Sequence, residues 1–341
     1  MALKDFVGLD IGAGSIKLVG LEKSKEGTWF LKVMGETENK VGLPDEKGSN
    51  VSELASLIKA LVTDLKLKTR TVVVSLPEKD VVSRLVKLPP LKESEIQDAL
   101  TFEAETFVPY PVSEALIDYS IVSRDEAGRM LIFAVAARKT LVVAYEKVFK
   151  KAGLELVAIE SPAVAMNRVI SSSVSSTGSV LLMDLGETTS DIVIARAGDI
   201  YLTRPVSVGG EALTRAISIN LGLDMKSAEE YKKAYGMRAS ELEGKIKNAL
   251  LPVFGSMAEE IRKAIIAYRE EWGKTIDLLV LSGGGANMPG LAEELTRVLG
   301  LEVQVIQPFL KVDSSGVTAP VDLTMEGCRF TLATGLAMRE V

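Results

Sequence analysis

Two short Asp-Gly phrases, one in each half of the chain, carry the residue types of a phosphate-binding site. The first is DIGAGSIK, which begins at Asp10, and the second is DLGETTSD, which begins at Asp184. In both, an apolar run leads into Asp-x-Gly and a second apolar run follows, as in a strand, a tight turn and a strand. The tip of such a hairpin brings backbone N–H groups close to a phosphate. The phrases lie about half the chain apart, which indicates a duplicated fold that holds a polyphosphate between its halves.

A third motif, LVLSGGGANMPGLAEEL (279–295), is a predicted strand that ends in three glycines before a helix. Glycine lets the backbone approach a flat ligand or a phosphate because no Cβ interferes. The start of the following helix adds a partial positive charge. The stretch is therefore a second candidate contact for a phosphate-bearing ligand.

The composition excludes several other kinds of chemistry. The chain has 341 residues and no His, which removes the commonest general base, the usual zinc ligand and every Ser-His or Cys-His pair. Cys328 is the only cysteine, so no intramolecular disulfide can form. The net charge of −6 argues against a nucleic-acid partner and gives no support to a polybasic membrane patch.

The N-terminus MALKDFVGLDIG lacks the layout of a signal peptide, and no apolar run approaches the roughly 18 residues of a membrane span. We therefore expect a cytoplasmic protein without direct membrane insertion, whose membrane role, if it has one, goes through a partner. At this length two domains are expected.

The elements that must position these motifs alternate between strands and helices, which indicates an α/β protein. The stretch 52–67 has apolar residues at helical spacing, with Ser52 as a plausible N-cap, and 71–77 has the uniform apolar character of a buried strand. Residues 80–150 form a predicted α/β insert, and the Ser-rich loop 171–178 separates the halves. Further expected elements are strands at 5–11, 16–22, 28–35, 277–284 and 302–308, mainly helix at 225–272, a long loop at 311–325 and a closing helix at 327–340.

The order of the three motifs resembles that of the actin-like ATPase superfamily, which includes actin, sugar kinases and bacterial actin homologues. The resemblance implies ATP and Mg²⁺ as cofactors, with Asp10 and Asp184 at the metal, most often through water. Singly, each aspartate is also typical of an ordinary turn, and Lys17 of a solvated strand; the matched pair favours the phosphate site. The residues implied at the phosphates are Gly12, Ala13, Gly14, Ser15, Lys17, Gly186, Thr188 and Thr189.

The same resemblance implies where the nucleoside lies. Gly283, Gly284 and Gly285 would stand beside the nucleotide, although a loose helix-entry loop is the alternative. The helical segment AEEYKK (228–233) would contact ribose and adenine, although a charged helix face is usually just solvated. The remaining residues implied at the nucleotide are Gly209, Gly210, Glu229, Lys232, Lys233 and Asn287.

The segments IESPAVAMN (159–167) and ATGLAMR (333–339) resemble the two connectors between the halves of such ATPases. Related enzymes place a carboxylate or an amide at the first connector, where it orients the attacking water. Glu160 is therefore the candidate catalytic residue, with a structural acid at a strand end as the alternative. We expect at most a slow ATPase, which suits a nucleotide used as a clamp or switch.

The insert makes the resemblance more specific, because its position matches the FtsA and PilM families. LPPLKESEIQDALTFEAETFVPYP, within the insert, and the stretch 205–236 resemble the PilM form. The implied fold is an actin-like (ribonuclease H-like) duplicated two-domain α/β fold with an FtsA/PilM-type inserted α/β subdomain. FtsA normally continues into a membrane helix that we do not expect here. The expected subdomains are 1–80 with 155–175, to which the helix of 327–341 returns; the insert 81–154; 176–222 with 273–326; and the helical 223–272.

The PilM resemblance implies a cytoplasmic platform of type IV pilus assembly, peripheral to the inner membrane. It implies binding of the N-terminal cytoplasmic peptide of PilN, a link to the PilN/PilO inner-membrane complex, and pilus motor ATPases as further candidate partners. An FtsA-like filament, a small-molecule kinase and a type II secretion role are the alternatives. The peptide groove would lie between the insert and the first subdomain, with candidate walls at Leu88, Leu91, Leu100, Phe102 and Phe107, although such residues are more often core.

Overall fold

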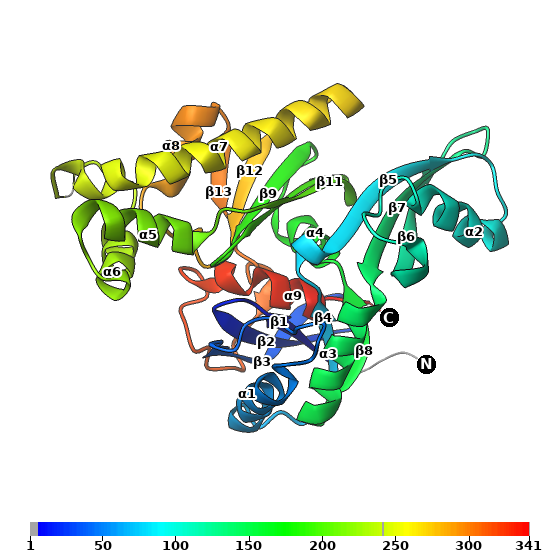
Figure 1. Cartoon of the computed structure of the whole chain (residues 1–341), viewed down its shortest axis with the longest axis horizontal. Helices are drawn as coiled ribbons and strands as arrows, with labels where there is room; N and C mark the ends of the chain where they lie inside the picture. The colour runs from blue at the N-terminus through cyan, green and yellow to red at the C-terminus, as the bar shows by residue number, and fades with distance from the viewer. Residues whose placement is uncertain (1–5, 241, 341) are drawn as a thin grey trace.

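The computed structural model describes residues 6–240 and 242–340. The elements form two large sheets, each with its own helices, and a smaller sheet that projects to one side (Figure 1). The start of the predicted strand 5–11 and the last residue of the segment 327–341 lie outside the described residues. The alternation of strands and helices expected from the sequence is confirmed.

The first sheet has the strand order β14-β3-β2-β1-β4-β8. The strands β1, β2 and β3 are antiparallel neighbours, whereas β4 and β8 extend the sheet in parallel with β1. Helices α1 (Val51–Asp64) and α3 (Lys139–Ala152) share one apolar core with β1, β2 and β4. The strands are β1 (Val7–Ile11), β2 (Ser15–Lys23), β3 (Trp29–Glu38), β4 (Thr71–Ser75), β8 (Glu155–Glu160) and β14 (Val312–Asp313).

The second sheet has the order β11-β10-β9-β12-β13 and repeats the antiparallel hairpin of the first. Its helices are α5 (Gly210–Leu221), α6 (Met225–Tyr235), α7 (Lys245–Trp272) and α8 (Leu291–Leu299), and a turn, η3 (Leu242–Gly244), precedes α7. Figure 1 shows the long α7 lying across this sheet. The strands are β9 (Ser179–Leu185), β10 (Ser190–Arg196), β11 (Asp199–Val206), β12 (Leu278–Ser282) and β13 (Glu302–Val305).

The insert has a three-stranded antiparallel sheet in the order β5-β7-β6, with strands β5 (Val81–Leu88), β6 (Ala115–Arg124) and β7 (Met130–Arg138). Helix α2 (Glu93–Ala104) covers one face through Ile96 and Leu100, which are fully buried. The turn η2 (Val112–Glu114) precedes β6, and η1 (Glu78–Asp80) leads from β4 directly into β5. The chain thus enters the insert at the end of a central strand of the first sheet.

Two helices lie between the large sheets, α4 (Pro162–Ser173) and α9 (Thr331–Ala337), the latter preceded by the turn η4 (Gly327–Phe330) (Figure 1). They approach closely at Gly335, where a Cβ would lie 2.0 Å from the carbonyl oxygen of Ala165. A side chain at this position would force the helices apart. Both helices are therefore packed as one unit between the halves.

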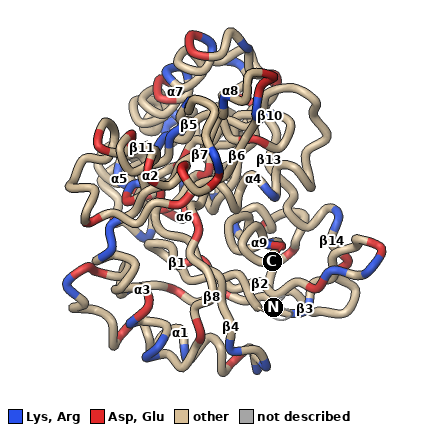
Figure 2. The backbone as a smooth tube through the Cα atoms, turned by 90° about the vertical axis from the view of Figure 1, so that its right-hand side faces the viewer, with Lys and Arg blue, Asp and Glu red and all other residues tan. Residues whose placement is uncertain are grey.

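Some local expectations were wrong in detail. The predicted helix 52–67 begins at Val51 with Asn50 as its N-cap, and Ser52 accepts a hydrogen bond from Lys151 Nζ at 2.6 Å. The predicted closing helix is shorter and begins as a tight turn. Figure 2 shows basic and acidic residues interspersed over both halves and the insert. Within residues 6–240 and 242–340, every helix is too short or too polar to cross a membrane.

Candidate functional site

A cavity of about 1030 Å³ opens between the two halves. Its walls come from both hairpin turns, from α5 and α6 and from the loop after β12, so segments far apart in the sequence meet there. The structure brings all but one of the residues predicted at the nucleotide to this cavity. They are Asp10, Gly12, Ala13, Gly14, Ser15, Lys17, Asp184, Gly186, Thr188, Thr189, Gly210, Glu229, Lys232, Lys233, Gly283, Gly284, Gly285 and Asn287.

The two hairpins place their charged residues at matching positions. Asp10 is opposite Lys17 in the β1–β2 register, and Asp184 is opposite Asp191 in the β9–β10 register. The turns require glycine: a Cβ at Gly186 would lie 2.7 Å from the carbonyl oxygen of Thr189. The duplicated phrases therefore form two similar turns, with a cation in the first hairpin where the second has a carboxylate.

The two turns also face one another across the cavity. A Cβ at Gly14 would lie 1.7 Å from Oε2 of Glu187 in the second turn. The Gly12 amide donates to the Ser15 carbonyl at 3.0 Å, which closes the first turn. A ligand bound here would therefore contact backbone from both halves at once.

Asp10 and Asp184 are partly buried at the floor of this cavity. Burial raises the pKa of Asp10 to about 6; Lys17, whose Nζ lies 3.9 Å from Oδ2, opposes the rise and Asp184 adds to it. Burial also raises the pKa of Asp184, against a hydrogen bond that Ser282 Oγ donates at 2.6 Å. Desolvation makes both carboxylates costly to ionise without a cation.

These carboxylates fit Mg²⁺, which prefers oxygen ligands and is usually held by one or two carboxylates, substrate phosphates and water. In the described ranges no group of three or more acidic, Cys or His residues could hold a metal ion by itself. The remaining ligands would therefore have to come from a phosphate-bearing molecule and from water. The glycine turns, the aspartates and the cavity volume together fit a metal-bound polyphosphate.

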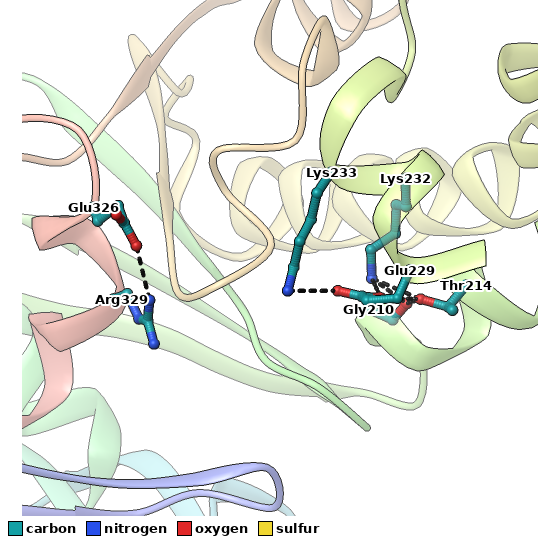
Figure 3. Close-up of polar contacts among 7 residues, drawn as sticks. All are labelled: Gly210, Thr214, Glu229, Lys232, Lys233, Glu326 and Arg329. Carbon is teal, nitrogen blue, oxygen red and sulfur yellow. Dashed lines mark hydrogen bonds and ion pairs between the residues drawn. The ribbon is translucent and has the colours of Figure 1, made fainter. Parts of the chain in front are cut away.

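On the far wall, Glu229 and Lys232 of α6 are bound to α5 (Figure 3). Lys232 is 7% exposed and donates to Gly210 O at 2.9 Å and to Thr214 Oγ1 at 2.8 Å, and it lies 2.7 Å from Glu229 Oε2. Lys232 is thus occupied by protein acceptors and holds Glu229 in place. Lys233 is largely exposed and lies 3.4 Å from Glu229 Oε1.

The glycine-rich loop after β12 packs against the second turn. Gly283 has a φ of +85°, and a Cβ there would lie 2.6 Å from the Leu185 carbonyl oxygen. Asn287 donates through Nδ2 to the Met325 carbonyl. Gly209 supports the second turn from behind, since its Cβ position is 2.5 Å from Glu187 O, and it does not line the cavity.

Glu160, the candidate catalytic residue, is held elsewhere. Its side chain is 4% exposed and accepts two hydrogen bonds from Arg168, at 2.6 and 2.7 Å, and one from Arg339. It does not line the cavity. The prediction that Glu160 orients water was therefore wrong, because both carboxylate oxygens join β8 to α4 and the end of α9.

Two of the five predicted groove residues are part of the insert core. Leu88 is 4% exposed and Leu100 is fully buried, so neither side chain is accessible to a partner, and the prediction was wrong for both. Leu91 and Phe107 are partly buried against the same core, and Phe102 is 71% exposed. Within α2, helical periodicity separates the buried Leu100 from the exposed Phe102, which composition alone does not.

Sequence reasoning missed several charged residues of the cavity, four of which matter here. Glu78 follows β4, Asp191 ends the second phrase, and Glu326 and Arg329 stand on the wall opposite α6, paired at 2.8 Å (Figure 3). Asp191 could have been found from its match to Lys17 in the duplicated phrases. The other three lie in turns without a pattern of their own.

The fold defined by these sheets and this cleft is that of the actin-like ATPases. The ethanolamine utilization protein EutJ from Carboxydothermus hydrogenoformans has it, at 18% identity and a TM-score of 0.58 over 97% of this chain and 88% of that one. So does MreB5 of Spiroplasma citri in its structure bound to AMPPNP, at 14% identity and a TM-score of 0.54 over 98% and 95%. The expected fold class is confirmed.

The chain belongs to the family of the type IV pilus assembly protein PilM, whose model matches residues 8–341. A chain of the PilM-PilN type IV pilus biogenesis complex is 26% identical, with a TM-score of 0.86 over 97% of both chains. Cell division protein FtsA of Bacillus subtilis is 27% identical over 276 residues, or 70% of this chain. The match spans 62% of that FtsA, so less than two thirds of its length is covered.

Proposed function

We propose that this chain is an ATP-binding platform protein of type IV pilus assembly. It docks the N-terminal peptide of PilN and thereby links a PilN/PilO complex in the inner membrane to the pilus motor. The observation that carries this proposal is the combination of a paired-turn cleft for a metal-bound polyphosphate with PilM family membership across the chain.

The nucleotide part of the proposal rests on charge and on backbone. ATP with Mg²⁺ supplies a divalent cation that offsets the desolvation of Asp10 and Asp184 and stabilises their ionised forms. The two turns offer N–H groups to the phosphates, Lys17 reaches them from β2, and Glu229 stands beside the ribose. Since both halves contribute, the bound nucleotide holds them together as a clamp.

Calorimetric titration with ATP–Mg²⁺ tests this part. We expect Asp184→Asn to abolish binding with a preserved circular dichroism spectrum, whereas Asp118→Asn, on the exposed side of β6, binds as the native chain does. Equal ATP affinity in both variants would refute the nucleotide site.

The partner part concerns the insert and the localisation. A tail of PilN brought to the insert would hold this chain at the cytoplasmic face of the inner membrane. Phe102, which projects from α2, is the apolar side chain of the predicted groove that remains available. We expect Phe102→Asp to weaken peptide binding and Ile219→Asp, equally exposed on α5, to leave it unchanged. The reverse result would move the docking site to the other half.

A further inference from the structure

Glu78 is a buried carboxylate of the cleft that none of the roles above uses. It begins η1, directly after β4, and lines the cavity at 2% exposure. Its Oε2 accepts a hydrogen bond from Ser161 Oγ at 3.3 Å, so it contacts the first connector, one residue beyond Glu160. Thr203 of β11 and the Ala163 amide are also close enough to influence its proton affinity. Glu78 therefore sits where the two halves and the connector meet.

The other carboxylate oxygen of Glu78 is unused. Within the described part of the chain, Oε1 is buried without a hydrogen bond of ordinary geometry. A buried acceptor without a partner is costly, and such atoms usually have a water or ligand beside them. Oε1 is enclosed in this arrangement, but Glu78 lines the cleft, so a small turn of its side chain would bring Oε1 to a water inside the nucleotide cavity.

We propose that Glu78 is the catalytic base of ATP hydrolysis in this chain, in the role that the sequence had suggested for Glu160. The inference rests on the nucleotide binding proposed above. Glu78 holds the attacking water through Oε1. As the water oxygen bonds to the terminal phosphorus, its proton passes to Glu78, the bond from phosphorus to the bridging oxygen breaks, and ADP leaves with that electron pair. The products are ADP and inorganic phosphate, and Glu78 returns its proton to solvent.

The local chemistry suits a base. Burial raises the pKa of Glu78 to about 7, and the neighbouring Thr203, Ser161 and Ala163 groups partly oppose the rise. A base is most effective when its pKa lies near the working pH. Asp191 is a second carboxylate of the cleft. Burial and the charges of Glu78, Asp184 and Asp10 raise its pKa well above the usual range, which makes it costly to ionise.

The test compares Glu78→Gln with Glu155→Gln, an exposed glutamate at the start of β8. We expect Glu78→Gln to keep ATP–Mg²⁺ affinity within about twofold and to lower single-turnover hydrolysis about 100-fold, a usual share for a general base. Its affinity for ADP with aluminium fluoride, which mimics the transition state, should fall at least about tenfold. Glu155→Gln should change none of the three.

Several results would overturn the assignment. They are unchanged hydrolysis in Glu78→Gln, no hydrolysis by the native chain, or a loss confined to Asp191→Asn. If Glu78→Gln fails to fold, Glu78→Asp takes its place; it withdraws the carboxylate by one methylene and should slow hydrolysis with ATP affinity kept. A native chain that fails to bind ATP at all would instead refute the proposed nucleotide site.

Discussion

The change Glu160→Gln tests whether this residue stabilises the hinge or takes part in chemistry. In the structure its carboxylate accepts three hydrogen bonds from two arginines, Arg168 and Arg339, and its side chain is 4% exposed. Arg168 also donates to the Gly335 carbonyl at 3.0 Å. The substitution removes the negative charge and replaces one of the two acceptor oxygens by an NH2 donor, which then faces a guanidinium group.

The expected loss in the free energy of unfolding follows from the burial of Glu160 and of its two arginine partners. Removal of one member of a buried ion pair costs about 3–5 kcal/mol. The arginine side chains are 25% and 34% exposed, so water recovers part of this energy. We therefore expect a fall of about 2–4 kcal/mol in the free energy of unfolding. ATP–Mg²⁺ affinity and hydrolysis should stay within about twofold, since Glu160 does not line the cleft.

Urea denaturation of Glu160→Gln, Arg168→Met and the double variant measures the interaction energy between Glu160 and Arg168. Glu155→Gln is the matched control, and its free energy of unfolding should stay within about 0.5 kcal/mol of the native value. Full stability in Glu160→Gln, or a loss of hydrolysis at normal stability and affinity, would refute the reasoning.

Three further predictions concern packing and charge. Gly335→Ala should destabilise the protein by about 2 kcal/mol or more, because its Cβ would meet the Ala165 backbone. Gly255→Ala, in the open middle of α7, should instead stabilise the protein by about 1 kcal/mol, and thermal denaturation of the two variants distinguishes these outcomes. Asp10→Asn should stabilise the metal-free protein at neutral pH by about 2 kcal/mol and abolish Mg²⁺-dependent ATP binding, and a loss of stability would contradict the buried charge. Folding raises the pKa of Glu78 from 4.5 to about 7, so between these pH values the folded chain keeps a proton that the unfolded chain has released. The free energy of unfolding should therefore fall as pH rises from 4.5 to 7, by up to about 3 kcal/mol from this group. Urea denaturation at a series of pH values should show a flatter slope in Glu78→Gln.

Much of the fold could be predicted from the sequence because its signals are local and repeated. The duplicated Asp-x-Gly phrases predict two hairpins, and those hairpins bring Asp10 and Asp184 to one cavity. The Gly-rich end of β12 follows the same logic, since a short loop there must pass close to Leu185. The order of the three motifs then indicated the resemblance to the actin-like superfamily.

The failures involve partners that are distant in the sequence. No residue near Glu160 in the sequence indicates that Arg339, close to the C-terminus, donates a hydrogen bond to its carboxylate. Glu78 is in a turn without a motif, and only the meeting of η1, the first connector and β11 makes it a cleft residue. The sequence shows that Leu88 and Leu100 are apolar, but it does not show that both side chains face the insert core. That orientation depends on the register of β5 and of α2.

The central claim is that this chain docks a partner tail while it holds nucleotide. Calorimetric titration of the ATP–Mg²⁺-loaded protein with a synthetic peptide from the extreme N-terminus of its PilN partner tests it most directly. The account predicts stoichiometric binding with micromolar affinity. A chain that binds ATP normally but gives no heat of binding with the peptide would contradict it.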